Sequence, residues 1–148
     1  MSCIRAATLA DISALVALEQ ACFPLDSWGE AALLGHIESP INATLLYLEG
    51  EEIVGALLTQ NICPEFEVLR IATHPDYRKR GVAKALLSAH TRAAKQQGYT
   101  KGFLEVRESN TPAKAFYQNA GYLPTGRRKN YDQNPTEDAI LMEILLEQ

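Results

Sequence analysis

One stretch near the middle of the chain restricts the fold more than any other, because a single long helix joins two apolar strands there. Residues 65–72 predict a strand, residues 80–97 predict a helix that ends before Gly98, and residues 103–106 predict a second strand. A strand–helix–strand unit of this length makes a right-handed crossover. The two strands should therefore be parallel neighbours in one sheet.

The rest of the chain surrounds this unit with further strands and helices. A helix that starts at Thr8 and a second helix over residues 28–37 precede the unit, and a helix over residues 111–119 follows it. The remaining predicted strands are residues 3–7, 44–48, 53–60 and 139–146. This order predicts an α/β fold in which a mixed sheet carries helices on both faces, and 148 residues suit a single domain, 1–148.

Composition argues against several classes of function. A formal net charge of −4 disfavours a nucleic-acid partner, because phosphate backbones bind basic surfaces. Cys3, Cys22 and Cys63 show no C-x-x-C spacing and the three histidines form no H-E-x-x-H cluster, so we predict no metal site. No run of about 18 apolar residues predicts a membrane span, and charges interrupt the N-terminus where a signal peptide would be apolar. We expect a cytoplasmic protein.

The turn between the first strand and the helix of this unit is basic and contains a glycine. Arg78, Lys79 and Arg80 add positive charge directly before Gly81, where a ligand can approach the backbone. The first amides of a helix lack internal acceptors and carry the positive end of the helix dipole, so this turn predicts an anion site. It is neither a P-loop nor a dinucleotide fingerprint, because Gly81 stands alone. A solvated basic turn is the alternative interpretation.

Glu105 and Tyr117 are candidate acid–base residues. Glu105 points away from its apolar neighbours near the carboxyl end of a strand, where open α/β sheets bind ligands. A structural glutamate paired with Arg107 fits the strand pattern equally well, and Glu67 on the neighbouring strand is the second candidate base. Tyr117 is either a core residue that anchors its helix or a proton donor.

Several segments resemble a known family. Residues 78–83, Arg-Lys-Arg-Gly-Val-Ala, match the Q/R-x-x-G-x-G/A signature of GNAT acetyltransferases, and the order of elements is similar along nearly the whole chain. The segments that resemble the RimI-like subfamily, ribosomal-protein-alanine N-acetyltransferases, are residues 104–110, 115–122, 127–131 and 137–142. The resemblance implies a mostly antiparallel sheet with one parallel βαβ crossover. It also implies that the two strands of the crossover splay apart and free backbone groups for the pantetheine arm of acetyl-CoA.

The same resemblance implies roles for individual residues, with Glu105 as the base and Tyr117 as the acid. The residues implied to contact acetyl-CoA are Ile71, Ala72, Thr73, Arg78, Lys79, Arg80, Gly81, Val82, Ala83, Lys84 and Asn110. The residues assigned to the acceptor side are Glu67, Tyr131, Glu137 and Asp138. A mobile surface hairpin is the alternative interpretation of residues 127–138. Arg70, where the subfamily has Asn, is one of four departures from the pattern, which bear on the acceptor more than on acetyl-CoA.

Acetyl transfer requires a neutral amine as the nucleophile. At pH 7.5 about a third of free α-amines are neutral, against roughly 0.1% of lysines, so an α-amine needs only a modest base. We therefore expect direct transfer from acetyl-CoA, with no metal and no acyl-enzyme, to the N-terminal α-amine of a protein, a small-subunit ribosomal protein in this subfamily. A lysine or small-molecule amine as acceptor is the second hypothesis, and a non-catalytic CoA-binding protein is the third.

Overall fold

One mixed sheet runs through the molecule, and the computed structural model describes it over residues 1–133 and 135–146. The strands in this part of the chain are β1 (Ser2–Ala6), β2 (Asn42–Glu49), β3 (Glu52–Ile62), β4 (Glu65–Thr73), β5 (Lys101–Arg107), β6 (Leu123–Asp132) and β7 (Glu137–Leu145). The α-helices are α1 (Ile12–Cys22), α2 (Glu30–Glu38), α3 (Val82–Gln96) and α4 (Thr111–Asn119). Two short 3₁₀ turns are η1 (Leu9–Asp11) and η2 (Pro75–Tyr77).

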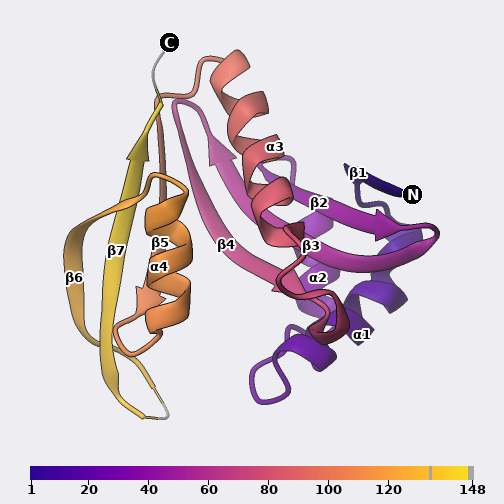
Figure 1. Ribbon diagram of the computed structural model, residues 1–148, viewed down its shortest axis with the longest axis horizontal. Helices are drawn as coiled ribbons and strands as arrows, with labels where there is room; N and C mark the ends of the chain where they lie inside the picture. The colour runs from indigo at the N-terminus through magenta and orange to yellow at the C-terminus, as the bar shows by residue number, and fades with distance from the viewer. Residues whose placement is uncertain (134, 147–148) are drawn as a thin grey trace.

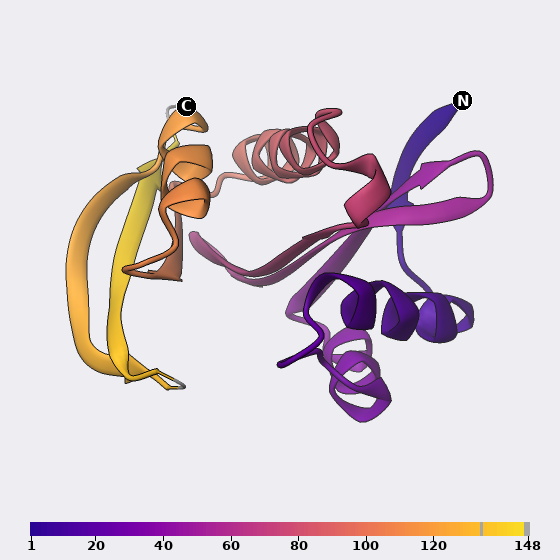
Figure 2. The same cartoon turned by 60° about the horizontal axis from the view of Figure 1, so that its bottom comes forward.

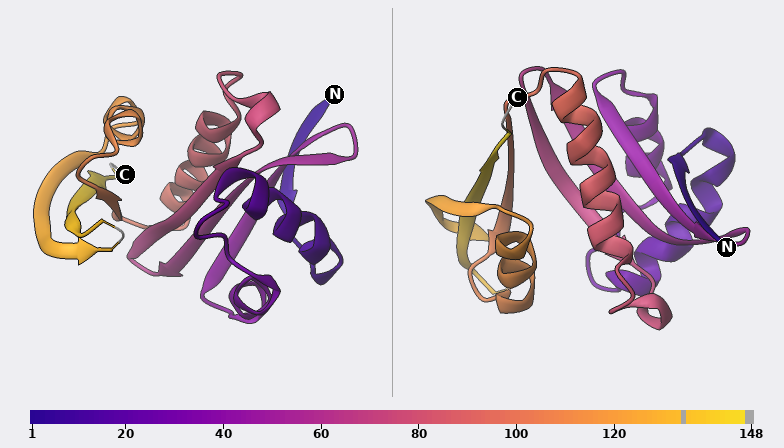
Figure 3. Two further views of the ribbon diagram at one scale, coloured as in Figure 1. Left: turned by 90° about the horizontal axis from the view of Figure 1, so that it is seen from below. Right: turned by 45° about the horizontal axis from the view of Figure 1, so that its top comes forward.

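The sheet has the order β1-β2-β3-β4-β5-β7-β6, and β4 and β5 are its parallel pair. The other neighbouring strands in the described residues are antiparallel. Helices α1 and α2 cover one face, while α3 and α4 lie on the other (Figures 2 and 3). This arrangement confirms the predicted α/β fold, with one parallel crossover through α3. Among the described residues, no helix combines the length and apolar character needed to cross a membrane.

The sheet divides where β4 leaves β5 (Figure 1). Parallel pairing ends at Glu67 and Phe103, after three residue pairs. On the other side of β4, consecutive residues of β3 lie opposite Val68 and Arg70, so Leu69 is the extra residue of a β-bulge. A bulge bends its strand and increases the local twist. The splay that the family resemblance implied is therefore confirmed, and the bulge begins directly after the last parallel pair.

An apolar core on each face holds the helices against the sheet. Side chains from the sheet and α3 in the first core include Leu57, Phe66, Leu86, Leu104 and Met142. Side chains in the second core, under α1 and α2, include Leu15, Leu33, Leu46 and Leu58. A Cβ atom at Gly55 would lie 2.5 Å from Cγ1 of Val82, so the missing side chain lets α3 approach β3 closely. The first core therefore positions the N-terminus of α3 beside the end of β4.

The sequence pattern predicts no strand over residues 123–132, and this prediction is wrong because β6 occupies them. Every residue of β6 except Asp132 is exposed, and Pro124 and Gly126 interrupt the strand pattern. β6 lies at the edge of the sheet and buries neither face, so it needs no alternation of apolar and polar residues. Periodicity therefore carries no signal for this strand.

The start of the long helix also differs from its prediction, because α3 begins at Val82 rather than at Arg80. Lys79 and Gly81 have φ angles of 64° and 80°, in the left-handed region that a helix excludes. The basic residues consequently belong to the loop rather than to the first turn. The helix over residues 111–119 is confirmed at both ends.

Candidate active site

A cavity of about 1110 Å³ opens beside the divided sheet. Its walls come from the end of β4, the loop before α3, one face of α3 and one face of α4. The predicted acetyl-CoA contacts that line it are Ile71, Thr73, Arg78, Lys79, Gly81, Val82, Ala83 and Lys84. Residues from a strand, a loop and a helix thus meet in one cavity large enough for an extended organic cofactor.

Three other residues of that prediction do not line the cavity. The Ala72 side chain is buried on the face that α1 and α2 cover. The Arg80 guanidinium lies 5.1 Å from the centre of the Tyr77 ring. Asn110 caps α4, where its Oδ1 accepts a hydrogen bond from the backbone N–H of Ala113 at 3.2 Å.

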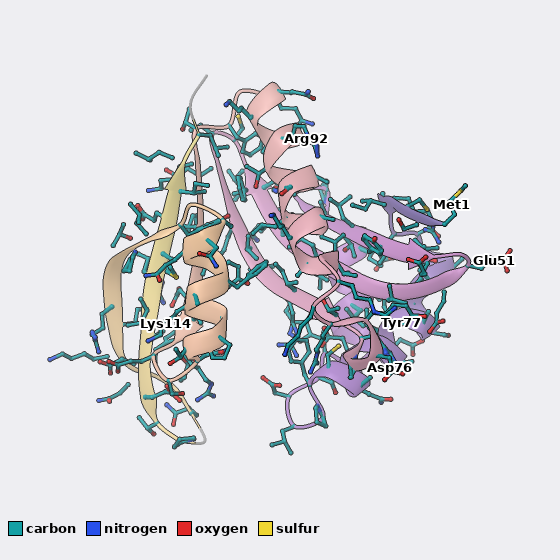
Figure 4. The ribbon with its side chains drawn as sticks, viewed as in Figure 1. Met1, Glu51, Asp76, Tyr77, Arg92 and Lys114 are labelled. Atoms are coloured by element: carbon teal, nitrogen blue, oxygen red, sulfur yellow. The ribbon has the colours of Figure 1, made fainter. Side chains whose placement is uncertain are left out.

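The loop before α3 presents backbone amides to the cavity. The first helical hydrogen bond runs from the N–H of Ala85 to the carbonyl of Gly81 at 2.9 Å, so the earlier amides of the helix have no intrahelical acceptor. Nothing lies within 4 Å of the position that a Cβ would take at Gly81. Arg78 Nε donates to the carbonyl of Thr73 at 3.2 Å, which folds the loop against β4. Figure 4 shows Tyr77 in the turn that leads into this loop. Free amides, the helix dipole and basic side chains together favour a phosphate ligand.

Glu105 and Glu67 lie on the same face of the sheet at the point where β4 and β5 separate. Glu67 is opposite Phe103, two residues before Glu105, so all three side chains leave one face. The intervening Leu104 points into the core under α3. Burial raises the pKa of the Glu67 carboxyl, and the negative charge of Glu105 raises it further, while Arg128 lowers it. The two carboxylates are therefore close enough to interact.

Arg128 of β6 contacts this pair, although the sequence did not single it out. Its Nε lies 3.3 Å from Oε2 of Glu105, but the angles are not those of a hydrogen bond. That buried carboxylate oxygen accepts no hydrogen bond from any described residue. Arg107, the partner that the structural interpretation proposed for Glu105, donates instead to Oε2 of Glu137 at 3.2 Å. Oε2 of Glu105 thus lies beside the Arg128 guanidinium and can still accept a hydrogen bond.

Tyr117 lies in the wall that α4 contributes to the cavity. Its ring packs against the rings of Phe116 and Tyr122, with centroids 5.2 Å and 5.8 Å away. Burial raises the pKa of the Tyr117 hydroxyl to about 12. The hydroxyl therefore stays protonated at neutral pH, as a proton donor must.

Three of the four residues predicted for the acceptor side, Tyr131, Glu137 and Asp138, lie on the β6–β7 hairpin, whereas Glu67 lies on β4. Glu137 accepts a hydrogen bond from the backbone N–H of Ser109 at 2.9 Å, and Asp138 accepts one from Arg127 Nη1 at 2.7 Å. These bonds, more than any other cause, lower the pKa of each carboxyl. Tyr131 is 53% exposed. The Glu137 carboxylate holds the hairpin to the segment after β5, and the Asp138 carboxylate joins β7 to β6 within the hairpin, whereas Tyr131 remains available at the surface.

Sequence reasoning missed other residues of the cavity wall. Ser88 and Thr91 line it and follow Lys84 at helical spacing on one face of α3, so periodicity could have identified them. Cys22 and Phe23, at the end of α1, also line it. Their place depends on how α1 packs against β4, for which the local sequence carries no signal.

Comparison with known proteins agrees with this geometry. The sequence pattern of the acetyltransferase (GNAT) family matches residues 12–122. A [ribosomal protein bS18]-alanine N-acetyltransferase of Haemophilus ducreyi is 31% identical over 139 residues, which cover 92% of this chain and 94% of that protein. The crystal structure of the Escherichia coli ribosomal-protein-S18-alanine N-acetyltransferase superposes with a TM-score of 0.92 at 26% identity, covering 100% of this chain and 96% of that one.

A more distant structure shares the fold. The PaiA N-acetyltransferase of Thermoplasma acidophilum, solved in complex with coenzyme A, has a TM-score of 0.82 at 18% identity and covers 98% of this chain and 99% of its own. The family match runs from α1 to the residue before β6 and includes the cavity loop, Glu105 and Tyr117. The chain therefore belongs to the acetyltransferase (GNAT) family and is an acetyl-CoA-dependent N-acetyltransferase.

Proposed function

We propose that this enzyme acetylates the N-terminal α-amine of a protein, with ribosomal protein bS18 as its acceptor. The names of its relatives in Haemophilus ducreyi and Escherichia coli support this acceptor. The observation that carries the proposal is the pair of interacting carboxylates, Glu105 and Glu67, at the point where β4 and β5 separate. A carboxylate there can bind a cationic amine and then accept its proton.

The cavity suggests which residues would bind each part of acetyl-CoA. The free amides at the start of α3, together with Arg78 and Lys79, would hold the pyrophosphate, because they combine the helix dipole with positive side chains. Ile71, Ala72 and Thr73 lie on the part of β4 that has left β5, where backbone groups are free to pair with the pantetheine arm. Arg80 and Asn110 would support the loop and the start of α4.

We assign the proton transfers to two residues. Glu105 accepts the proton of the amine, directly or through water, and the neutral nitrogen attacks the thioester carbonyl carbon. As the C–N bond forms, the C–S bond breaks, and Tyr117 donates its proton to the departing thiolate. The acylated nitrogen then loses its remaining extra proton, which returns through water to the Tyr117 phenolate, and the products are the amide and the CoA thiol. A thiol has a pKa near 8.5, so the thiolate needs little help to leave, and the amine side carries most of the barrier. Glu67 is the second candidate for the base. Burial raises the pKa of its carboxyl, and a carboxylate with a higher pKa accepts a proton more readily.

The β6–β7 hairpin would form one wall of the peptide site. Tyr131 is exposed there and can pack against a peptide, whereas Glu137 and Asp138 hold the hairpin in place through their hydrogen bonds. Their remaining negative charge would attract a basic N-terminal segment over a distance of about one Debye length.

A peptide panel tests the acceptor. We expect turnover of a peptide that carries the N-terminal sequence of bS18 with a free alanine amine, and none once that amine is formylated. A peptide blocked at its N-terminus but carrying a lysine should react far more slowly at pH 7.5, because its neutral fraction is roughly 300-fold smaller. Equal turnover of the free and blocked peptides would exclude the α-amine. Mass spectrometry locates the acetyl group in each product.

A further inference from the structure

Arg128 reaches Glu105 across the strand that separates them. It stands opposite Ala139 of β7, while Glu105 stands opposite Leu141 of the same strand. The small side chain of Ala139, opposite Arg128, leaves room for the long arginine to lie over β7. A residue of the edge strand β6 thereby reaches the splayed edge of β5.

The contact between Arg128 and Glu105 is weak, whereas hydrogen bonds hold the neighbouring Arg127 in place. Arg127 Nη1 donates to Glu108 at 2.9 Å and to Asp138 at 2.7 Å. Arg128 lies 3.3 Å from Glu105 without hydrogen-bond geometry, and its side chain is 60% exposed. Its guanidinium also lies 5.0 Å from the centre of the exposed Tyr131 ring. Only a small free energy therefore holds Arg128 in place, and a competing cation can displace it.

The position that Arg128 occupies suits the charged form of an acceptor amine. Two carboxylates face it, and Oε2 of Glu105 keeps its acceptor capacity. A free α-amine has a pKa near 7.7–8.0 and arrives mostly as an ammonium at neutral pH, with three donors for such oxygens. The charged and titratable groups on the strands around the pair include Arg107 of β5, Glu137 of β7, and Arg128 and Tyr131 of β6. Lys101 of β5 lies on the same face, where its Nζ is 3.9 Å from Glu65 of β4 and 3.4 Å from Glu143 of β7.

We propose that Arg128 is a positioning residue that occupies the acceptor-amine position on Glu105 and Glu67, and moves away when the amine binds. The inference rests on the proposed function, because the displaced cation is an α-ammonium. With no acceptor present, the positive charge of Arg128 opposes the rise in the pKa of Glu67 that burial and Glu105 cause. With an acceptor present, its exposed side chain swings into solvent and the ammonium replaces it.

Arg128→Gln separates this role from a structural one, because it should lower the KM for the peptide and raise the ratio of kcat/KM at pH 8 to that at pH 6. Without its competitor, the peptide at pH 8 should bind more tightly, and its KM should fall by about two- to fivefold. Without the neighbouring positive charge, Glu67 holds its proton to higher pH, so the ratio of kcat/KM at pH 8 to that at pH 6 should rise by about two- to fivefold. The KM for acetyl-CoA should not change.

Two variants serve as controls. Arg128→Lys keeps the charge and should restore the wild-type pH ratio. Lys129→Gln removes one positive charge from the next position of β6 and should change neither quantity. A rise in the peptide KM of Arg128→Gln, or an unchanged pH ratio, would overturn the proposal.

A measurement without an acceptor separates this inference from the proposed function. Carbon-13 NMR of the glutamate carboxyls, assigned with Glu67→Gln, follows the titration of Glu67 in the wild type and in Arg128→Gln. The midpoint should move to higher pH in the variant, and an unmoved midpoint contradicts the role of Arg128. If the wild type turns over no free N-terminal peptide, the proposed acceptor is wrong, while this titration still decides whether Arg128 controls the carboxylates.

Discussion

Two glutamate–arginine pairs lie on either side of the split in the sheet, and they differ in nearly every physical respect. In the first, Arg70 Nε donates to both carboxylate oxygens of Glu19 at 3.0 Å, and the side chains are only 14% and 3% exposed. Glu19 also accepts the backbone N–H of Trp28 at 2.8 Å, and Arg70 donates to the carbonyl of Asp26 at 2.9 Å. Its guanidinium lies 3.8 Å from the centre of the Phe23 ring.

The second pair, Glu105 and Arg128, has none of these additional bonds. Its 3.3 Å contact lacks hydrogen-bond geometry, and the arginine side chain is 60% exposed. The two distances are similar, at 3.0 Å and 3.3 Å, so the pairs differ in the number of further hydrogen bonds and not in the separation of their charges. The first pair, with its hydrogen bonds to Trp28 and Asp26, stabilises the loop after α1. A pair with unused acceptors can exchange its partner for a substrate.

The largest effect should follow from Glu105→Gln. If Glu105 is the base, kcat should fall by about 10²–10⁴-fold, because the amide cannot accept a proton. The free energy of unfolding should change by less than about 1 kcal/mol, because a half-exposed ion pair contributes little. Steady-state kinetics and urea denaturation measure the two quantities.

Glu67→Gln is the matched control for that prediction, since it alters the other carboxylate of the pair. If Glu67→Gln loses more activity than Glu105→Gln, the base has been assigned to the wrong glutamate. A large loss of stability in Glu105→Gln would mean that Glu105 and Arg128 stabilise the fold, as Glu19 and Arg70 do.

Arg70→Met should have the next largest effect, and on stability rather than on chemistry. It leaves the buried carboxylate of Glu19 without its cation, which costs about 3–5 kcal/mol of unfolding free energy. The midpoint of urea denaturation reports the loss. The double variant Glu19→Leu/Arg70→Met removes both charges and should be more stable than Arg70→Met alone. If the double variant is less stable than Arg70→Met, an unpaired buried charge is not the cause of the stability lost in Arg70→Met.

Tyr117→Phe should have the smallest effect of the three. The thiolate leaves readily without a proton donor, so kcat should fall by on the order of tenfold. Tyr122→Phe is the control, because its buried hydroxyl has no hydrogen-bond partner among the described residues, and its kcat should match the wild type. Wild-type kcat in Tyr117→Phe would leave the tyrosine a purely structural role.

Much of the fold was predictable because each buried element repeats a local pattern. The apolar face of α3 and the alternation in β5 identified the crossover, and the basic residues before Gly81 predicted an anion site. The splay of β4 from β5 came from the family resemblance instead. It depends on a bulge at Leu69, and nothing in the apolar run of β4 marks that position.

The sequence by itself determined most of the elements, the basic loop before α3 and the candidate acid–base residues, because these follow from local spacing and residue type. Only the tertiary structure decided which partners the carboxylates have. Arg107, two residues from Glu105, binds Glu137, whereas Arg128, on a strand without any periodic signal, reaches the carboxylate. Charge pairing depends on which side chains meet across the sheet, and strand order sets that over distances that no local pattern spans.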